Sequence, residues 1–194
     1  MAAEKALLDE FRISGALLDG HFVLSSGLHS PQYLQCAIAL QQSKSALKYG
    51  RKIAEAFEGV HIDTVASPAI GGLVIGLATA AALGSRFIWT ERDHGMMTLR
   101  RGFDVSPGEK ILVVEDVITT GGSTRECIDA LTQRGGVIVG AASIVDRSNG
   151  KADVGVPRIS LISLDVPTYD PAECPLCAAG QEAVKPGSRT VAKA

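Results

Sequence analysis

Short runs of consecutive apolar residues alternate along this chain with segments of helical periodicity. The runs are rich in Val and Ile, which is typical of buried strands in a parallel sheet. Predicted strands cover residues 64–66, 86–89, 111–114, 137–145 and 157–163, and predicted helices cover 43–57, 73–83 and 123–134. Because most helices fall between strands, the order predicts an α/β fold with a mostly parallel, twisted sheet flanked by helices.

The N-terminal segment has a different pattern. Apolar residues such as Leu7 and Phe11 are spaced among charges, which predicts an amphipathic helix from residue 4 to about 18. Residues 20–35 then alternate apolar and polar positions around a Ser-Ser-Gly turn, and they contain Pro31. This pattern favours a small hairpin outside the main sheet.

Length and charge narrow the class of protein. The chain has 194 residues, 46% hydrophobic side chains and a formal net charge of −2. We expect one domain covering residues 1–194. The small net charge gives no support for a nucleic-acid or membrane-surface partner, and no uninterrupted apolar run approaches the length of a membrane span. Charged residues interrupt the N-terminus where a signal peptide would be apolar, so we expect a cytoplasmic protein.

The most informative stretch is the predicted strand 111–114 and the residues after it. Glu115 and Asp116 fall where that strand is expected to end, and the segment Thr119 to Thr124 leads into the next helix. A glycine-rich turn before a helix binds anions, because backbone amides and the helix dipole point at the ligand. Carboxylates beside it suit sugar hydroxyls or a shared divalent cation. The stretch therefore predicts a site for a phosphorylated sugar.

Three further segments carry candidate chemistry. Ser67 to Gly72 repeats the strand, turn and helix order, so its amides are expected to bind a pyrophosphate at the same sheet edge. Residues 90–108 have no convincing helix or strand pattern throughout and contain Arg92 and His94, which predicts a cationic lid. Arg147 follows a strand at the ligand-binding edge, where its guanidinium would bind a carboxylate in a bidentate manner. The alternative is an ion pair with Asp146 or a surface charge.

These motifs resemble a known family. Residues 113–124, Val-Val-Glu-Asp-Val-Ile-Thr-Thr-Gly-Gly-Ser-Thr, resemble the phosphoribosyl-pyrophosphate (PRPP) motif of the type I phosphoribosyltransferases. Residues 20–35 and the Asp-His-Gly of the 90–108 segment resemble those of the orotate phosphoribosyltransferases, in particular a bacterial subgroup with a short loop. The resemblance implies the type I fold with a small N-terminal hood formed mainly by residues 1–40 with C-terminal contributions.

The resemblance also implies a function. It indicates transfer of the phosphoribosyl group from PRPP to orotate, giving orotidine 5′-monophosphate and pyrophosphate in UMP biosynthesis, with Mg²⁺ bound mainly through PRPP. A homodimer is implied, because in the family the 90–108 loop reaches the neighbouring subunit. The implied catalytic residues are Asp116, Arg92 and His94. The implied PRPP-binding residues are Glu115, Asp116, Thr119, Thr120, Gly121, Gly122, Ser123, Thr124, Ser67, Pro68, Ala69, Ile70, Gly71 and Arg92. The implied orotate-binding residues are Arg147, Thr120 and Ser26.

The chain departs from the family pattern at Ser25 and Gly71, where many or some members carry a lysine. Two other functions remain open: a purine or xanthine phosphoribosyltransferase, and a PRPP-binding regulator without catalysis. Cys174 and Cys177 form a CxxC motif, which is half of a zinc site or a redox pair. Reduced thiols in a tight turn are the preferred interpretation, because the sequence alone does not point to further ligands.

Overall fold

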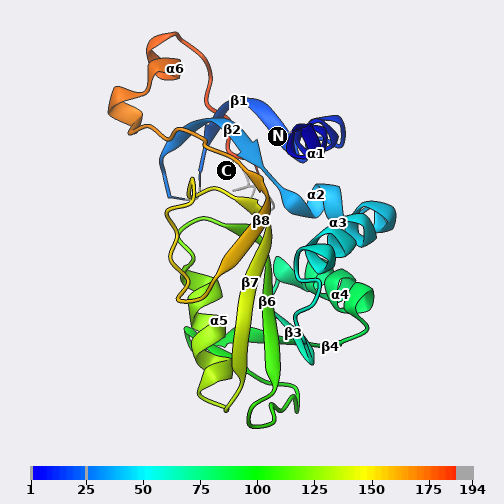
Figure 1. Ribbon diagram of the computed structural model, residues 1–194. Helices are drawn as coiled ribbons and strands as arrows, with labels where there is room; N and C mark the ends of the chain where they lie inside the picture. Colours follow the sequence, from blue (N-terminus) through cyan, green and yellow to red (C-terminus); the bar gives the residue numbers. More distant parts are fainter. Residues whose placement is uncertain (1, 25, 187–194) are drawn as a thin grey trace. The chain divides into compact units, whose positions relative to one another are not determined.

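The computed structural model describes residues 2–24 and 26–186 (Figure 1). The chain forms two compact units. One unit combines the chain up to Ile38 with the chain from Asp165 onward, and the other is the continuous stretch Ala39–Leu164.

The larger unit contains a six-stranded sheet and three long helices. Its strands are β3 (Thr64–Pro68), β4 (Arg86–Asp93), β5 (Met96–Leu99), β6 (Lys110–Ile118), β7 (Val137–Asp146) and β8 (Arg158–Ser163). Its helices are α3 (Ser43–Ala56), α4 (Gly72–Leu83) and α5 (Gly122–Thr132), while the short α2 (Cys36–Leu40) lies where the two units join in sequence.

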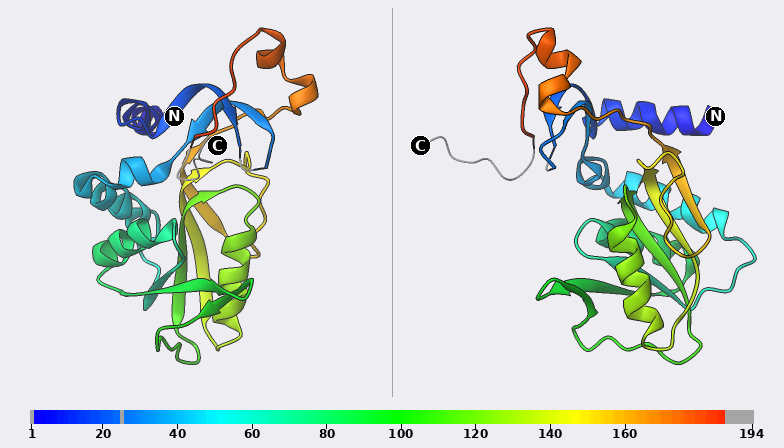
Figure 2. Two further views of the ribbon diagram at one scale, coloured as in Figure 1. Left: turned by 180° about the vertical axis from the view of Figure 1, so that it is seen from behind. Right: turned by 90° about the vertical axis from the view of Figure 1, so that its left-hand side faces the viewer.

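The strands of this sheet lie in the order β5-β4-β3-β6-β7-β8. All neighbours are parallel except β4 and β5. Strand β3 leads through α4 to β4 on one side, whereas β6 leads through α5 to β7 on the other. Helices α3 and α4 therefore cover one face of the sheet and α5 covers the opposite face (Figure 2). The direction of winding changes between β3 and β6, where ligands of open α/β sheets bind.

The core beneath α5 holds this arrangement together. Cys127, Ile128 and Leu131 of the helix pack with Val113 of β6 and Ile88 of β4, and all five side chains are buried. Burying one such aliphatic side chain contributes roughly 1.5–3 kcal/mol. The apolar face of α5 is therefore what fixes the helix, and with it the turn before the helix, on the sheet.

The smaller unit is built on a hairpin of β1 (Leu17–Val23) and β2 (His29–Leu34), preceded by α1 (Ala2–Ile13). The C-terminal segment, which contains η1 (Pro171–Glu173) and α6 (Pro175–Ala178), bridges to the hairpin at two places. Tyr169 exchanges backbone hydrogen bonds with His29, and Val184 bonds to the backbone of His21 and Val23. The two ends of the chain are thus joined within this unit.

The structure confirms the α/β class and the mostly parallel sheet. Three local predictions were wrong. The first helix ends at Ile13 rather than near residue 18, because Leu17 and Leu18 begin strand β1. Strand β6 does not end before Glu115 but continues to Ile118, because its pairing with β7 persists that far. Residues 90–99 are not irregular, since β4 and β5 form an antiparallel hairpin.

Among residues 2–24 and 26–186, no helix combines the length and apolarity needed to cross a membrane.

Candidate functional site

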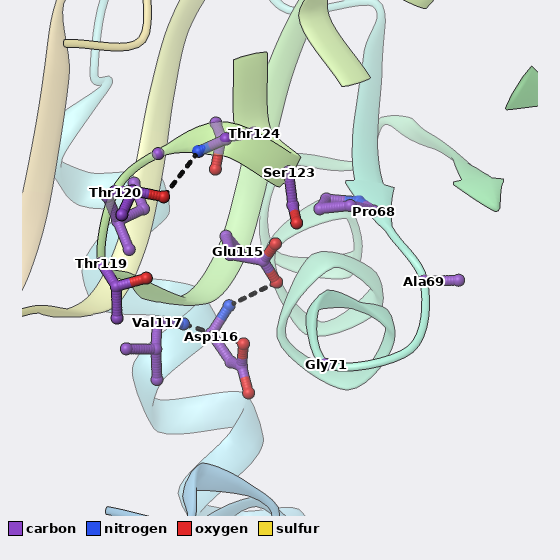
Figure 3. A pocket seen from close by; sticks show the side chains of 13 residues that line it. Pro68, Ala69, Gly71, Glu115, Asp116, Val117, Thr119, Thr120, Ser123 and Thr124 are labelled. Atoms are coloured by element: carbon purple, nitrogen blue, oxygen red, sulfur yellow. Dashed lines mark hydrogen bonds between the residues drawn. The ribbon is translucent and has the colours of Figure 1, made fainter. Parts of the chain in front are cut away.

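A pocket lies between β3 and β6 at the point where the sheet changes its direction of winding. Strand β3 pairs with β6 only as far as Ala66 and Val113, whereas β6 runs on to Ile118 beside β7. The last residues of β6 are therefore open on the β3 side. The resulting cavity has a volume of about 290 Å³. Its lining residues are Pro68, Ala69, Gly71, Glu115, Asp116, Val117, Ile118, Thr119, Thr120, Gly121, Gly122, Ser123 and Thr124 (Figure 3).

The acidic pair occupies the inner wall of this pocket. Glu115 is buried, and one of its carboxylate oxygens accepts a hydrogen bond of 3.1 Å from the backbone amide of Asp116. Asp116 is half-buried and accepts a bond of 2.8 Å from the amide of Val117. Burial, together with the charge of the neighbouring Asp116, raises the pKa of Glu115 to about 9. Burial also raises the pKa of Asp116 above its ordinary value.

Two adjacent carboxyl groups that cannot both ionise easily need compensation from a ligand. Hydroxyl donors or a nearby positive charge would supply it, because either stabilises the ionised form. A ribose with its hydroxyls directed at Glu115 and Asp116 meets that requirement.

The turn after β6 forms the opposite wall. Gly121 is the N-cap of α5 and has a φ of 79°, which is the left-handed region that glycine adopts without steric cost. A Cβ atom at this position would also lie 2.8 Å from Cγ1 of Val154. The hydroxyl of Thr120 accepts a bond of 3.4 Å from the amide of Gly122. First-turn amides of a helix have no partner within the helix, so the start of α5 is suited to a phosphate.

The loop after β3 forms the third wall and approaches the acidic pair closely. A Cβ atom at Gly71 would lie 2.6 Å from Oδ1 of Asp116, and one at Gly72 would lie 3.1 Å from Oε1 of Glu115. Pro68, Ala69 and Gly71 line the cavity, while Ile70 is 83% exposed. Ser67 is buried, and its hydroxyl lies against Gly76 of α4, where a Cβ atom would collide with it. The backbone of this loop, rather than the Ser67 side chain, faces the pocket.

The cations of the 90–108 segment do not line the pocket of their own chain. Arg92 forms an ion pair of 2.7 Å with Glu126 of α5, and Arg101 one of 2.8 Å with Glu91. His94 lies in the turn of the β4–β5 hairpin, where its side chain is 94% exposed. The predicted lid is thus a charged hairpin that reaches into solvent in the single chain.

Arg147 lies beside the pocket rather than in its wall. It follows β7 directly, and its backbone amide donates a hydrogen bond of 2.8 Å to the carbonyl of Ile118, a pocket residue. The neighbouring Asp146 is buried and forms an ion pair of 2.9 Å with Arg158. Asp146 therefore has a structural partner, and the backbone of Arg147 lies next to that of Ile118 at the edge of the pocket.

The remaining predicted site residue, Ser26, belongs to the smaller unit. It is exposed in the turn between β1 and β2, and its hydroxyl accepts a bond of 3.4 Å from the amide of Leu28. Ser25, where the family pattern has a lysine, lies outside the described residues. Sequence reasoning missed Val117 and Ile118 as lining residues, although both lie inside the recognised motif.

The sequence matches a family model described as a phosphoribosyl transferase domain over residues 39–167. It is also 53% identical over 186 residues to an orotate phosphoribosyltransferase of Chlorobium phaeobacteroides, an alignment that covers 96% of each chain. The chain belongs to the orotate phosphoribosyltransferase family. The matched range coincides closely with the larger unit, Ala39–Leu164, so the family's defining domain is the one that carries the pocket.

Solved structures of family members have the same fold. The orotate phosphoribosyltransferase of Aeropyrum pernix superposes with a TM-score of 0.66 at 26% identity, covering 81% of this chain and 93% of that one. The Mycobacterium tuberculosis orotate phosphoribosyltransferase in complex with PRPP gives a TM-score of 0.66 at 27% identity, covering 83% and 96%. The type I phosphoribosyltransferase fold expected from the sequence is therefore confirmed.

Proposed function

We infer that this chain transfers the 5-phosphoribosyl group from PRPP to orotate, giving orotidine 5′-monophosphate and pyrophosphate in pyrimidine biosynthesis. Membership of the orotate phosphoribosyltransferase family supports the reaction. We assign the reaction to the pocket between β3 and β6. There, an acidic pair that includes the buried Glu115, a helix N-terminus and a glycine-containing loop form three walls around one cavity.

Each wall suits one part of PRPP. The turn from Thr119 to Thr124 binds the 5′-phosphate through backbone amides and hydroxyls at the start of α5. Glu115 and Asp116 accept hydrogen bonds from the ribose hydroxyls. The backbone of residues 68–71 belongs to the third wall, where amides can contact the pyrophosphate. Pro68 has no amide hydrogen, and the amide of Ala69 already donates a hydrogen bond of 2.7 Å to the carbonyl of Thr90, so Ile70 and Gly71 provide the donors.

The pocket also fits Mg²⁺ carried by the substrate. Carboxylate oxygens are the donors that Mg²⁺ prefers, and Glu115 and Asp116 are the acidic residues among those that line the cavity. Magnesium usually keeps several waters and binds through substrate phosphates, so we assign it to PRPP with these carboxylates nearby. When bound, it neutralises charge on the departing pyrophosphate.

Positioning and electrostatics carry most of the acceleration in this proposal. The bond between C1 of the ribose and the pyrophosphate breaks with positive charge developing on the ring, as in glycoside cleavage. Asp116, held by the amide of Val117, stabilises that charge when ionised. The pocket walls hold the ribose and phosphate in place, so the reacting atoms stay aligned while the bond breaks.

We assign the choice of base to Arg147. Its backbone adjoins that of Ile118 at the pocket edge, and we assign to its guanidinium a bidentate contact with the carboxylate of orotate. Thr120 contributes a hydroxyl from the same edge. Purine bases lack that carboxylate and gain nothing from this arginine. Ser26 stays a predicted orotate contact.

We further propose that the chain acts as a homodimer in which the β4–β5 hairpin of one subunit serves the pocket of the other. His94 and Arg92 are the groups expected to protonate or neutralise the leaving pyrophosphate. Neither is among the residues that line the cavity of their own chain. Exposed ion pairs such as Arg92–Glu126 are worth only about 0–1 kcal/mol, so a pyrophosphate competes for the arginine at little cost.

Initial-rate assays with PRPP and Mg²⁺ test this function. The purified chain is incubated with orotate, uracil, xanthine, hypoxanthine or adenine, and nucleotide and pyrophosphate are both quantified. We expect turnover of orotate alone. Turnover of a purine base would replace the orotate assignment with that of a purine phosphoribosyltransferase. PRPP binding without turnover of any base would indicate a regulator.

A further inference from the structure

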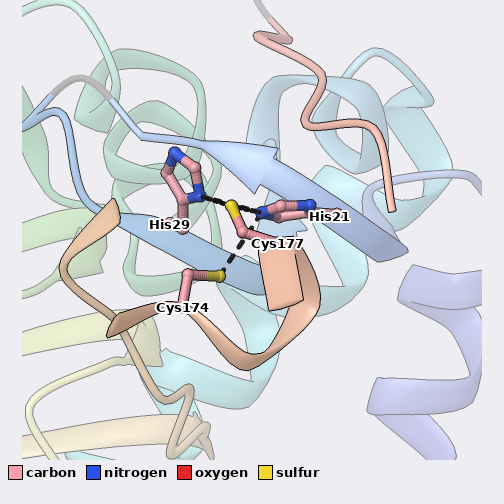
Figure 4. A group of neighbouring side chains, drawn as sticks. All are labelled: His21, His29, Cys174 and Cys177. Carbon is pink, nitrogen blue, oxygen red and sulfur yellow. Dashed lines mark hydrogen bonds between the residues drawn. The ribbon is translucent and has the colours of Figure 1, made fainter. Parts of the chain in front are cut away.

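Four potential metal ligands converge in the smaller unit, which contains none of the pocket-lining residues. His21 and His29 come from the β1–β2 hairpin, and Cys174 and Cys177 come from the C-terminal segment around α6 (Figure 4). One ligand atom from each residue lies within 4.8 Å of the other three. The CxxC motif noted in the sequence thus has the two further ligands that the sequence alone did not reveal.

Strand pairing explains how the histidines meet. Val23 pairs with His29 across the hairpin, and His21 lies two residues before Val23, within an irregularity of the strand register between Asp19 and Phe22. Both histidine side chains are buried, and Nε2 of His21 lies against Nδ1 of His29. Their rings meet edge to face with centroids 4.8 Å apart.

The C-terminal segment places the cysteines over that face. Backbone bridges from Tyr169 to His29 and from Val184 to Phe22 bracket the segment on both sides. Between them, Cys174 is buried as the N-cap of α6, and its carbonyl accepts a hydrogen bond of 3.1 Å from Ala178. The turn that results directs both thiols toward the histidines (Figure 4).

The distances match a tetrahedral ion. Nε2 of His21 lies 2.8 Å from Nδ1 of His29 and 3.5 Å from Sγ of Cys174. Sγ of Cys177 lies 3.8 Å from the first nitrogen and 3.3 Å from the second. Zinc bonds of about 2.0–2.1 Å to nitrogen and 2.3 Å to sulfur place tetrahedral ligands roughly 3.3–3.8 Å apart. Of these four distances, only that of the nitrogen pair is shorter, by about half an ångström, and a bound ion would separate the two nitrogens.

The protonation of His21 also suits a metal. Its Nδ1 lies 2.9 Å from the carbonyl oxygen of Gln181, which can only accept a hydrogen bond, so Nδ1 carries the hydrogen. In the neutral ring, Nε2 then presents its lone pair to the cluster. A backbone carbonyl that fixes the tautomer of a histidine ligand in this way is a recurrent feature of protein metal sites.

We propose that His21, His29, Cys174 and Cys177 bind one Zn²⁺ ion in a closed structural site. Two neutral imidazoles and two thiolates around a divalent ion give a neutral complex, which lowers the cost of burying the cluster. Tetrahedral coordination by two nitrogens and two sulfurs is the arrangement that selects zinc. With all four positions filled by the protein, the ion has a structural role and ties the C-terminal segment to the hairpin.

Metal analysis of the full-length protein tests the proposal. Protein purified from zinc-supplemented cultures should contain about one zinc per chain, and X-ray absorption should show two sulfur and two nitrogen neighbours at roughly 2.3 and 2.0–2.1 Å. After removal of zinc with a mercurial reagent and a chelator, titration with Co²⁺ should give the visible absorption of a tetrahedral thiolate complex, saturating at one equivalent.

Variants locate the ion. Cys177→Ser and His29→Asn should each reduce the zinc content at least fivefold and lower the thermal midpoint. His61→Asn serves as the matched control, because this histidine is 70% exposed and lies outside the cluster, and it should retain full zinc. Wild-type protein that takes up neither Zn²⁺ nor Co²⁺ would overturn the proposal even if the variants failed to fold. A mass lower by two hydrogens, locating a Cys174–Cys177 disulfide in freshly purified protein, would overturn it in favour of a redox pair.

Discussion

The backbone of Gly71 lies against the carboxylate of Asp116, so closely that a Cβ atom at position 71 would be 2.6 Å from Oδ1. This contact joins the loop after β3 to the strand that carries the acidic pair. Gly71 also stands where some family members have a lysine. In this chain, a larger residue at position 71 would require the loop or the carboxylate to move.

We therefore expect Gly71→Ala to weaken PRPP binding. Because either the loop or Asp116 must shift, the KM for PRPP should rise roughly tenfold, equivalent to about 1.4 kcal/mol. Steady-state kinetics with varied PRPP measures the effect. Gly59→Ala is the control: its φ of 82° strains an alanine where no neighbouring atom is close, so it should lower stability without changing the KM. An unchanged KM in Gly71→Ala would contradict the close approach.

The raised pKa of Glu115 predicts a pH-dependent stability. The folded protein holds the Glu115 proton up to about pH 9, whereas the unfolded chain releases it near the ordinary value of 4.5. The folded state therefore binds more protons between these pH values, and this group's contribution to stability falls as pH rises from 4.5 to 9. Glu115→Gln, which cannot ionise, should remove that part of the slope.

At pH 8.5 the Glu115→Gln protein should be more stable than wild type, and at pH 5 the two should be similar. A gain of about 1 kcal/mol would raise the thermal midpoint by roughly 2–4 °C for a chain of this size. Thermal unfolding monitored by circular dichroism across this pH range, without PRPP, provides the measurement. Parallel pH curves for both proteins would show that Glu115 is not the buried group with the raised pKa.

Arg147 is expected to discriminate in favour of orotate. Removal of a charge-assisted contact costs about 1.5–3 kcal/mol, so Arg147→Ala should raise the KM for orotate roughly 10- to 100-fold. The KM for PRPP should stay within a factor of about two, because the phosphate and ribose walls are intact. Arg147→Lys should recover only part of the loss, since lysine lacks the bidentate geometry.

Kinetics with both substrates varied distinguishes this role from a structural one. Arg51→Ala provides a control on an exposed arginine of α3 and should leave both constants unchanged. An equal loss of affinity for orotate and PRPP in Arg147→Ala would show that Arg147 supports the pocket as a whole instead of selecting the base.

Subunit mixing tests whether the β4–β5 hairpin acts on a partner subunit. His94→Ala and Asp116→Asn should each lower kcat at least ~100-fold. If His94 serves the neighbouring pocket, a mixed dimer contains one site with both residues intact. An equal mixture that exchanges subunits should then regain about a quarter of the wild-type activity, because half the dimers are mixed and each has one active site. If the mixture is no more active than the separate variants, His94 either acts in the pocket of its own chain or takes no part in catalysis.

Local patterns in the sequence predicted those features that depend on neighbouring residues. The turn from Thr119 to Thr124 follows β6 directly and leads into α5. Its suitability for binding a phosphate can therefore be predicted without knowing the rest of the fold. The order of strands and helices likewise predicted the class of sheet, because hydrophobic periodicity records which faces are buried. The sequence also predicted that Arg147 follows the C-terminal end of a long buried strand, and it directly follows β7.

Tertiary pairing decided the rest. Strand β6 continues past Glu115 because β7 supplies hydrogen-bond partners, and the pocket opens because β3 stops pairing at Ala66. The 90–108 segment begins with the β4–β5 hairpin, and its Arg92 forms an ion pair with Glu126, which belongs to the distant helix α5. His21 and Cys174 are 153 residues apart in sequence, and only the bridges between the chain's two ends bring them together. A single sequence records its local periodicity, whereas contacts between distant residues depend on how its elements pair in space.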